Sequence, residues 1–123
     1  MRRQSVSFFT EKEEEFVNLL IAISMSKYVA NMLIFLVNTP EATSREIERG
    51  TDMHQPEVSL TIKYLFRQEW IKSREIPSDR KDRPRKTYSL AVPVNVVLAT
   101  IEKEKKDEVK RRLALVRKII DYL

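Results

Sequence analysis

The fold is indicated most clearly by residues 44–71, SREIERGTDMHQPEVSLTIKYLFRQEWI, and by residues 83–90, RPRKTYSL. Thr43 and Glu46 have the spacing of a capping box, in which a hydroxyl and a carboxylate bind the first N–H groups of a helix. A short helix is therefore expected over 44–50.

A second helix follows after a turn of four residues, 51–54. Pro56 suits its first turn, because the N–H that proline lacks has no partner there. The apolar positions that recur at spacings of four and three are Val58, Ile62 and Leu65. This periodicity indicates the buried stripe of a helix over 55–67. The two helices and their turn make a helix-turn-helix, residues 43–68.

A β-hairpin is predicted after these helices, over residues 71–92. Its extended segments are 71–76 and 87–92, and the segment between them, PSDRKDRPRK, has two prolines and no apolar residue. Residues 72–86 hold seven Lys or Arg and three acidic residues, a surplus of four positive charges. A solvated cationic tip at 77–86 is expected to contact phosphates.

Two N-terminal helices are expected within 11–38. Thr10 and Glu13 predict the start of the first, which should run over 11–24. Ser26 can cap the second, over 27–38, which ends before Pro40 because the residue before a proline disfavours helical geometry. The second helix is apolar almost all round, so it needs cover on more than one side. The first helix and a second subunit are expected to supply that cover.

Residues 16–37 are long enough and apolar enough to raise the possibility of a membrane span. Lys27 lies near their centre, where a cation costs roughly 2.5–3.5 kcal/mol on insertion scales. Four Ser and Asn side chains add polarity. Two buried helices are the better interpretation, and no membrane partner is expected.

The C-terminal segment, 93–123, contains nothing that breaks a helix. Its apolar positions follow threes and fours: Leu98, Ile101, Val109, Leu113, Val116, Ile120 and Leu123. A polar gap at Lys105 and Glu108 separates two contact regions, one for its own domain and one for a partner helix. We therefore expect a dimerisation helix about 45 Å long.

Composition narrows the function classes. The 123 residues suit a single domain, 1–123, with a net charge of +5 that favours polyanionic partners. No cysteine, a single histidine (His54) and a single glycine (Gly50) argue against thiol chemistry, zinc sites and Gly-rich phosphate loops. No catalytic residues, metal or cofactor are predicted, so the chain is not expected to be an enzyme. No apolar run of a secretion signal's length occurs at the N-terminus, so a cytoplasmic location is expected.

Residues 26–92 resemble the winged helix-turn-helix transcription regulators of the MarR, ArsR and TrmB kind, and are similar to small archaeal predicted regulators. The resemblance implies a mainly α fold with a small β-hairpin, an extra N-terminal helix and a long C-terminal helix for dimerisation. It also implies double-stranded DNA as partner. The residues that match the family's core are Ile47, Met53, Val58, Ile62, Leu65, Trp70 and Ile71. Metal sensing is not expected, because the Cys and His sets of that branch are absent.

The candidate DNA-binding residues lie at the two ends of the helix-turn-helix, along its second helix and in the wing. They are Ser44, Arg45, Gln55, Pro56, Ser59, Leu60, Lys63, Tyr64, Arg67, Arg80, Lys81, Arg83, Arg85 and Lys86. Leu60 and Tyr64 have two open interpretations: contact with a thymine methyl and a phosphate, or packing beneath the wing. Phe66 and Trp70 are expected in the core.

Two residues depart from the family's pattern. Glu48 stands where a small alanine usually lets the two helices approach closely. Glu69 stands where glycine is usual, at a helix exit that often needs positive φ, and a side chain there costs about 1 kcal/mol.

The expected function is that of a homodimeric, sequence-specific transcription regulator, dimerised through its N-terminal and C-terminal helices. Helix 55–67 would enter the major groove, with half-sites about 34 Å apart or a multiple of that. The alternative is a winged-helix module that binds a protein of the transcription machinery, because this fold serves both purposes. The sequence does not identify the operator, a small-molecule effector, or whether transcription is activated or repressed.

Overall fold

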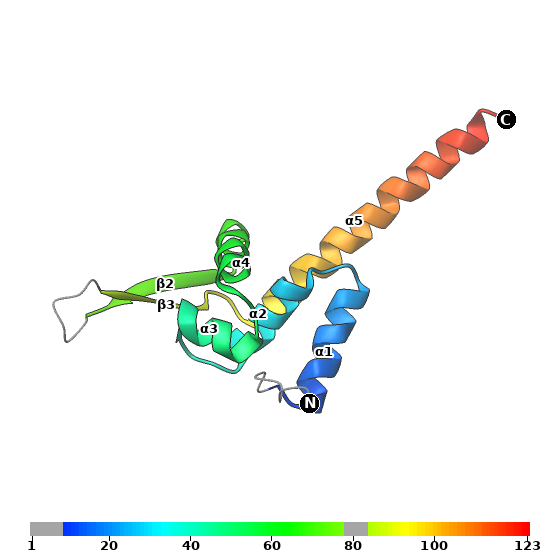
Figure 1. The fold of residues 1–123 in the computed structure, drawn as a ribbon. Coiled ribbons are helices and arrows are strands. Elements are labelled where there is room, and N and C mark those ends of the chain that lie inside the picture. Colours follow the sequence, from blue (N-terminus) through cyan, green and yellow to red (C-terminus); the bar gives the residue numbers. More distant parts are fainter. Residues whose placement is uncertain (1–8, 78–83) are drawn as a thin grey trace. The chain divides into compact units, whose positions relative to one another are not determined.

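The computed structural model describes residues 9–77 and 84–123 (Figure 1). It divides into two compact units, Met1–Ala91 and Val92–Leu123. The helices of the first unit are α1 (Glu11–Ala22), α2 (Lys27–Val37), α3 (Ser44–Thr51) and α4 (Gln55–Arg67), and its strands are β1 (Ala42–Thr43), β2 (Ile71–Ile76) and β3 (Arg85–Leu90). The second unit contains α5 (Val94–Asp121). This confirms a mainly helical winged-helix fold with a small sheet and a long C-terminal helix.

The predicted caps form. Thr10 and Thr43 each accept a hydrogen bond from the backbone N–H three residues on, and the carboxylates of Glu13 and Glu46 accept one from the backbone N–H of Thr10 and Thr43. Ser26 caps α2 by accepting a hydrogen bond of 3.2 Å from the N–H of Tyr28. These side chains satisfy N–H groups that have no partner within the helix.

Helix α1 ends at Ala22, two residues before the predicted end. Ser24 has a φ of 78°, in the left-handed region that stops a helix. The N–H groups of Ser24 and Met25 turn back to bind the carbonyls of Ile21 (2.8 Å) and Leu20 (3.1 Å). The last turn thus closes on itself, and α2 begins in a new direction.

The cover of α2 comes from its own chain. Six of its eleven residues are buried, and α2 contacts α1, α3, α4 and β3. The expectation that a second subunit supplies further cover stays a prediction, and Tyr28 and Val37 of α2 are still exposed, at 37% and 39%. The sequence pattern alone could not show that three further elements of the same unit pack around this helix.

The sheet is antiparallel with the strand order β1-β3-β2, and β1 was not predicted. Its residues, Ala42 and Thr43, pair with Tyr88 and Thr87. A strand of two residues has no periodicity for sequence reasoning to detect. Strand β3 begins and ends two residues before the predicted 87–92, since the ladder with β2 runs from Ile71↔Leu90 to Ile76↔Arg85.

All seven predicted core residues of the helix-turn-helix are buried: Ile47, Met53, Val58, Ile62, Leu65, Trp70 and Ile71. Phe66 differs from expectation, because 39% of it stays exposed while its ring edge packs on Tyr88 at 6.1 Å between centroids. It lies at the rim of the core, between α4 and the returning strand of the wing.

Two backbone features hold the helix-turn-helix. Asp52 ends α3 in the left-handed region, with a φ of 57°. Gly50 allows α3 to approach α2, because a Cβ there would lie 2.7 Å from Cδ1 of Phe35. Glu48, which stands where a small alanine is usual at the approach of α3 to α4, is half-buried. Glu69 has a φ of 64°, so the predicted positive φ at the exit of α4 is confirmed.

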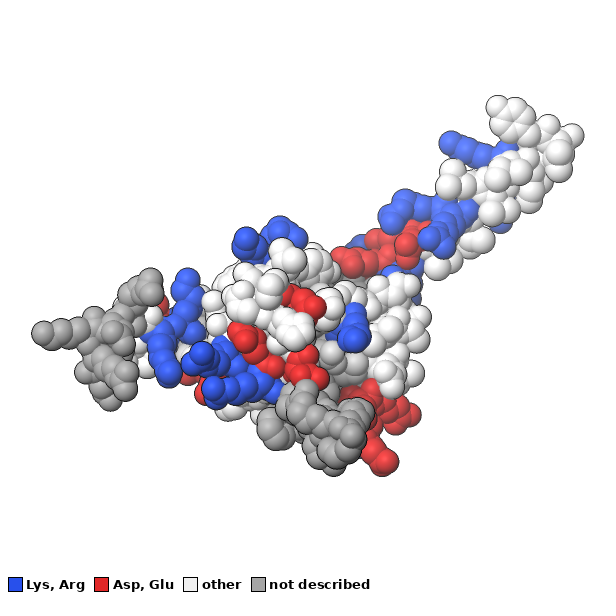
Figure 2. Space-filling view, viewed as in Figure 1, with Lys and Arg blue, Asp and Glu red and all other residues white. Residues whose placement is uncertain are grey.

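In the second unit, α5 buries only Val97 and Ile101 among its residues. Beyond them, Glu102–Lys106 (3.4 Å) and Glu108–Arg112 (3.7 Å) form ion pairs on its surface. Toward the C-terminal end of α5, where Figure 2 shows few charged side chains, Leu113, Leu115, Val116, Ile119 and Ile120 are exposed. Over the described residues, no helix is both long enough and apolar enough to cross a bilayer.

Candidate nucleic-acid interface

Helix α4 presents one face to the core and the opposite face to solvent. Val58, Thr61, Ile62 and Leu65 form the buried face. The exposed face carries the predicted contact residues Gln55, Pro56, Leu60, Lys63 and Arg67, with Ser59 half-buried at its edge. Leu60, on this face, is 67% exposed. This face offers amide, hydroxyl, apolar and cationic groups along a single helix.

The start of α4 is fixed by Glu57, a residue that sequence reasoning did not single out as a site residue. Its carboxylate accepts a hydrogen bond from the N–H of His54 (2.9 Å) and another from the hydroxyl of Tyr28 in α2 (3.0 Å). The His54 N–H, with a smaller contribution from the Tyr28 hydroxyl, holds the pKa of Glu57 below its ordinary value. The same hydrogen bond to Glu57 raises the pKa of Tyr28. One carboxylate thus caps α4 and ties it to α2.

Tyr64 lies on the flank of α4, where its ring packs edge-on against Trp70 at 6.2 Å between centroids. Its side chain is half-buried, whereas Leu60 points outward. The two residues that the sequence left undecided therefore differ. Leu60 belongs to the exposed face, and the ring of Tyr64 supports the exit of α4.

The register of β2 and β3 shows on which face of the hairpin each cation lies. Lys72, Arg74 and Arg85 share one face, because Lys72 pairs with Ser89, Arg74 with Thr87 and Ile76 with Arg85. Lys86 lies on the other face, directly across from Glu75. Lys72, Arg85 and Lys86 are exposed.

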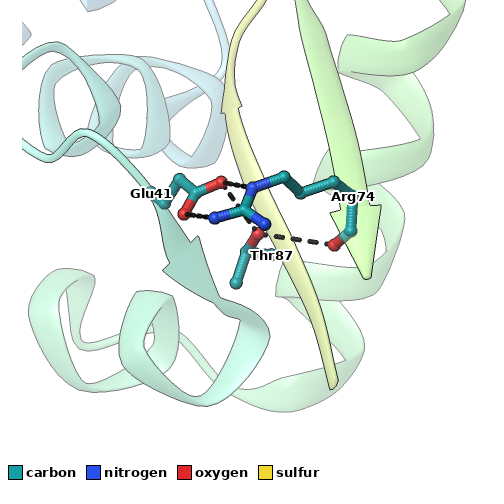
Figure 3. Close-up of polar contacts among 3 residues, drawn as sticks. All are labelled: Glu41, Arg74 and Thr87. Atoms are coloured by element: carbon teal, nitrogen blue, oxygen red, sulfur yellow. Dashed lines mark hydrogen bonds and ion pairs between the residues drawn. The ribbon is translucent and has the colours of Figure 1, made fainter. Parts of the chain in front are cut away.

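Arg74 is held by a contact that the sequence did not predict (Figure 3). Its guanidinium makes a two-pronged ion pair with Glu41, with Nη2 donating to Oε1 at 2.9 Å and Nε donating to Oε2. The buried Thr87 donates to Glu41 as well, at 3.3 Å. Glu41 is 33 residues from Arg74, and no spacing in the sequence links the two.

This cluster has a clear electrostatic result. Hydrogen bonding from Arg74 lowers the pKa of Glu41, and the carboxylate raises the pKa of Arg74 in return. Arg74 therefore anchors β2 to the segment before β1. In the described part of the wing, the exposed cations that form no ion pair with another described residue are Lys72, Arg85 and Lys86.

The remaining predicted residues lie in two places. Ser44 is half-buried and Arg45 exposed in the first turn of α3. Arg80, Lys81 and Arg83 lie outside the described residues. Figure 2 shows Lys and Arg side chains over the hairpin, over α3 and over the end of α4. Within residues 9–77 and 84–123, no group of three His, Asp or Glu side chains could hold a metal ion.

No protein-family model and no curated protein sequence matches this chain. Solved structures do. TrmBL2, an archaeal chromatin protein with a novel mode of DNA binding, superposes with a TM-score of 0.68 and 20% identity over 90% of this chain. The chain spans only 40% of the length of that protein.

Two further structures are similar. A possible transcriptional regulator from Methanosarcina mazei Go1 has a TM-score of 0.59 and 15% identity, covering 81% of this chain and 85% of its own. NMB1585, a MarR family regulator from Neisseria meningitidis, has a TM-score of 0.50 and 18% identity, covering 81% and 68%. At such low sequence identities, the likeness shows that the chain has the winged-helix fold and shows nothing further about its function.

Proposed function

We propose that the chain is a sequence-specific, double-stranded-DNA-binding transcription regulator that acts as a homodimer. The observation that carries this proposal is the outward face of α4, which is polar and cationic and belongs to the same compact unit as a hairpin with exposed Lys and Arg. A B-DNA major groove admits one α-helix, and a neighbouring hairpin can then reach the backbone.

Helix α4 supplies two kinds of contact in this proposal. Gln55 and Ser59 lie toward its N-terminus, where a recognition helix reads base edges. Leu60, at 67% exposure, suits the methyl group of thymine. Lys63 and Arg67 lie further along the helix and neutralise phosphates, which sets affinity rather than sequence preference.

The wing adds phosphate contacts. Lys72 and Arg85 lie on one face of the hairpin, and Lys86 lies on the other. For cations on both faces to contact phosphates, the hairpin has to enter a groove or run along one, with a sugar–phosphate backbone on each side. Arg80, Lys81 and Arg83 extend the same cationic segment in the sequence.

The homodimer rests on α5. Val109, Leu113, Val116, Ile120 and Leu123 recur at spacings of four and three and are each about half exposed or more. Such a stripe is the seam of a coiled coil, where a second copy buries it. In the first unit, Leu19 of α1 and Ile23, the residue that follows α1, are exposed too, at 60% and 43%, and are the proposed N-terminal dimer contacts. Two-fold symmetry then sets half-sites about 34 Å apart or a multiple of that.

DNA binding is tested by selecting the preferred duplex from a random pool and measuring affinity by fluorescence anisotropy. If about 6–10 phosphates are contacted, affinity falls by about 10³–10⁵ between 50 and 200 mM salt. Gln55→Ala and Ser59→Ala reduce the preference for the selected duplex over a scrambled one. Arg85→Ala weakens binding to both duplexes alike.

Lys12→Ala is the control, because Lys12 is an exposed cation that belongs to α1 and not to α4 or the wing strands. Affinity that is insensitive to salt, or equal losses for Lys12→Ala and Arg85→Ala, contradicts the proposal. Failure to select any duplex would favour the alternative of a protein-binding module, for which the exposed Leu60 would be an anchor.

The dimer is tested by sedimentation of the full chain. Leu113→Lys with Ile120→Lys places two charges in the apolar stripe and is expected to yield monomers. Leu115→Lys is the matched control, because Leu115 has the same 58% exposure as Leu113 but lies off the stripe. A monomeric wild-type chain at micromolar concentration, or dissociation by Leu115→Lys alone, argues against this interface.

A further inference from the structure

A cavity of about 250 Å³ opens between α1, α2 and the end of α3, wholly within the first unit. Helix α1 contributes one stripe, Glu14, Val17, Asn18 and Ile21, at the spacing that puts side chains on a single face. Helix α2 contributes Lys27 and Asn31, and α3 contributes Thr51. The volume lies below the roughly 300–1,000 Å³ of drug-sized pockets, so the cavity suits a small metabolite.

The polar walls carry opposite charges. Glu14 brings a carboxylate from α1 and Lys27 an ammonium from α2, and no ion pair joins them in the described structure. The side-chain amides of Asn18 and Asn31 make no hydrogen bond with other described residues either. The cavity therefore offers a ligand a negatively charged carboxylate, a positively charged ammonium group and two side-chain amides.

The apolar part of the lining complements these groups. Val17 is buried and Ile21 is about one-third exposed, and both lie on the same α1 stripe as Glu14. Phe9 lines the cavity beside them. A ligand with one anionic end, one cationic end and a compact apolar group matches all three features. A ligand with only a carboxylate would be repelled by the carboxylate of Glu14. A ligand with only an amine would be repelled by the ammonium of Lys27.

We propose that this cavity binds a free α-amino acid with an apolar side chain, with its ammonium on Glu14, its carboxylate on Lys27 and its side chain against Val17 and Ile21. Charge-assisted hydrogen bonds at both ends supply the orientation. The asparagine amides satisfy the remaining oxygens and N–H groups of the ligand.

The position of the cavity couples it to helix α4. Lys27 is the first residue of α2 and directly precedes Tyr28, whose hydroxyl donates to Glu57 at the start of α4. Thr51 directly precedes Asp52, the left-handed residue between α3 and α4. A ligand carboxylate that draws Lys27 into the cavity shifts the first turn of α2 and with it the hydrogen bond from Tyr28 to Glu57. The amino acid thus changes how α4 is held, and through it affinity for DNA; this last step rests on the proposed function.

Binding is tested by isothermal titration calorimetry on the full chain without DNA. The probes are L-valine, L-leucine and L-methionine, each compared with analogues that lack one charge; for leucine these are 4-methylpentanoate and 3-methylbutylamine. At least one amino acid is expected to bind, and each of its analogues to bind about 10- to 100-fold more weakly, as loss of a charged hydrogen bond implies. The proposal is overturned if no amino acid binds at 10 mM, or if an analogue binds as well as its parent.

Variants locate the site. Glu14→Gln and Lys27→Gln are expected to weaken binding by a similar 10- to 100-fold. Glu15→Gln and Lys12→Gln change the same charges at exposed positions of α1 that do not line the cavity, and should leave binding unchanged. Thermal unfolding of all four variants checks that they fold. Equal losses in the lining and control variants would refute the site.

Coupling is measured separately, by anisotropy with the selected duplex at zero and saturating amino acid. Any factor by which the amino acid changes DNA affinity must equal the factor by which DNA changes amino-acid affinity. A chain that binds the amino acid but no duplex refutes the proposed function and leaves the site standing. A chain that binds duplex but no amino acid refutes the site and leaves the proposed function standing.

Discussion

Gly50→Ala provides a direct test of how α3 is seated on α2. An added Cβ would lie 2.7 Å from Cδ1 and 2.9 Å from Cζ of Phe35, and closer still to Cε1. Real Cβ atoms do not approach other atoms within 3.0 Å, so the ring or the helix must move. Overpacking of this kind costs about 1–3 kcal/mol, and three ring atoms place it at the upper end.

An opposing effect has to be subtracted. Alanine in a helix interior is about 1 kcal/mol more favourable than glycine. The expected net loss in the free energy of unfolding is therefore about 2 kcal/mol. For a chain of this length the melting temperature should fall by roughly 8 °C. Urea unfolding at a fixed protein concentration measures the loss, because a dimer makes stability depend on concentration.

Phe35→Leu supplies the matched background, since leucine lacks the ring atoms that the new Cβ would meet. In that background Gly50→Ala should be neutral or stabilise by up to about 1 kcal/mol. An equal loss in both backgrounds, or a stabilised Gly50→Ala protein with Phe35 intact, would refute the steric explanation.

Three further outcomes are expected. Glu69→Gly relieves a φ of 64° and should raise the free energy of unfolding by about 1 kcal/mol, measured in urea, whereas Glu69→Ala should give no gain. Glu57→Gln should lower the melting temperature at pH 7; because the pKa of Glu57 is lowered in the folded chain, the difference from wild type should shrink as pH falls through that pKa, and a constant difference would contradict it. Glu41→Gln should speed amide hydrogen exchange at Arg74 and Thr87 in the wing, with exchange in α1 unchanged; uniform acceleration would mean general destabilisation instead.

The helix-turn-helix was predictable because its signals are local. The capping box of Thr43 and Glu46, and the apolar stripe of Val58, Ile62 and Leu65, each depend on residues three or four apart. The positive φ of Glu69 followed from the departure from glycine at a helix exit. Each of these signals depends on residues within one helical turn, so it is visible in the sequence without the fold.

The interface was predictable only as a set of candidates. Leu60 and Tyr64 are four residues apart on the same helix, yet the first points to solvent and the second packs on Trp70. Arg74 counts as one more cation of the wing in the sequence, whereas in the fold Glu41 neutralises it. Which charges face a partner depends on residues brought together from distant parts of the chain.

The order of residues was thus enough to indicate where helices start, which face of each is apolar and where cationic charge concentrates, since helix caps and periodicity act over three or four residues. The folded chain was needed to show that β1 pairs with β3, that Gly50 lies against Phe35, that Glu57 links α4 to Tyr28 and that α1, α2 and α3 leave a charged cavity between them. Each of these contacts joins residues at least 15 positions apart in the chain or on different elements, where packing and not local preference sets the geometry.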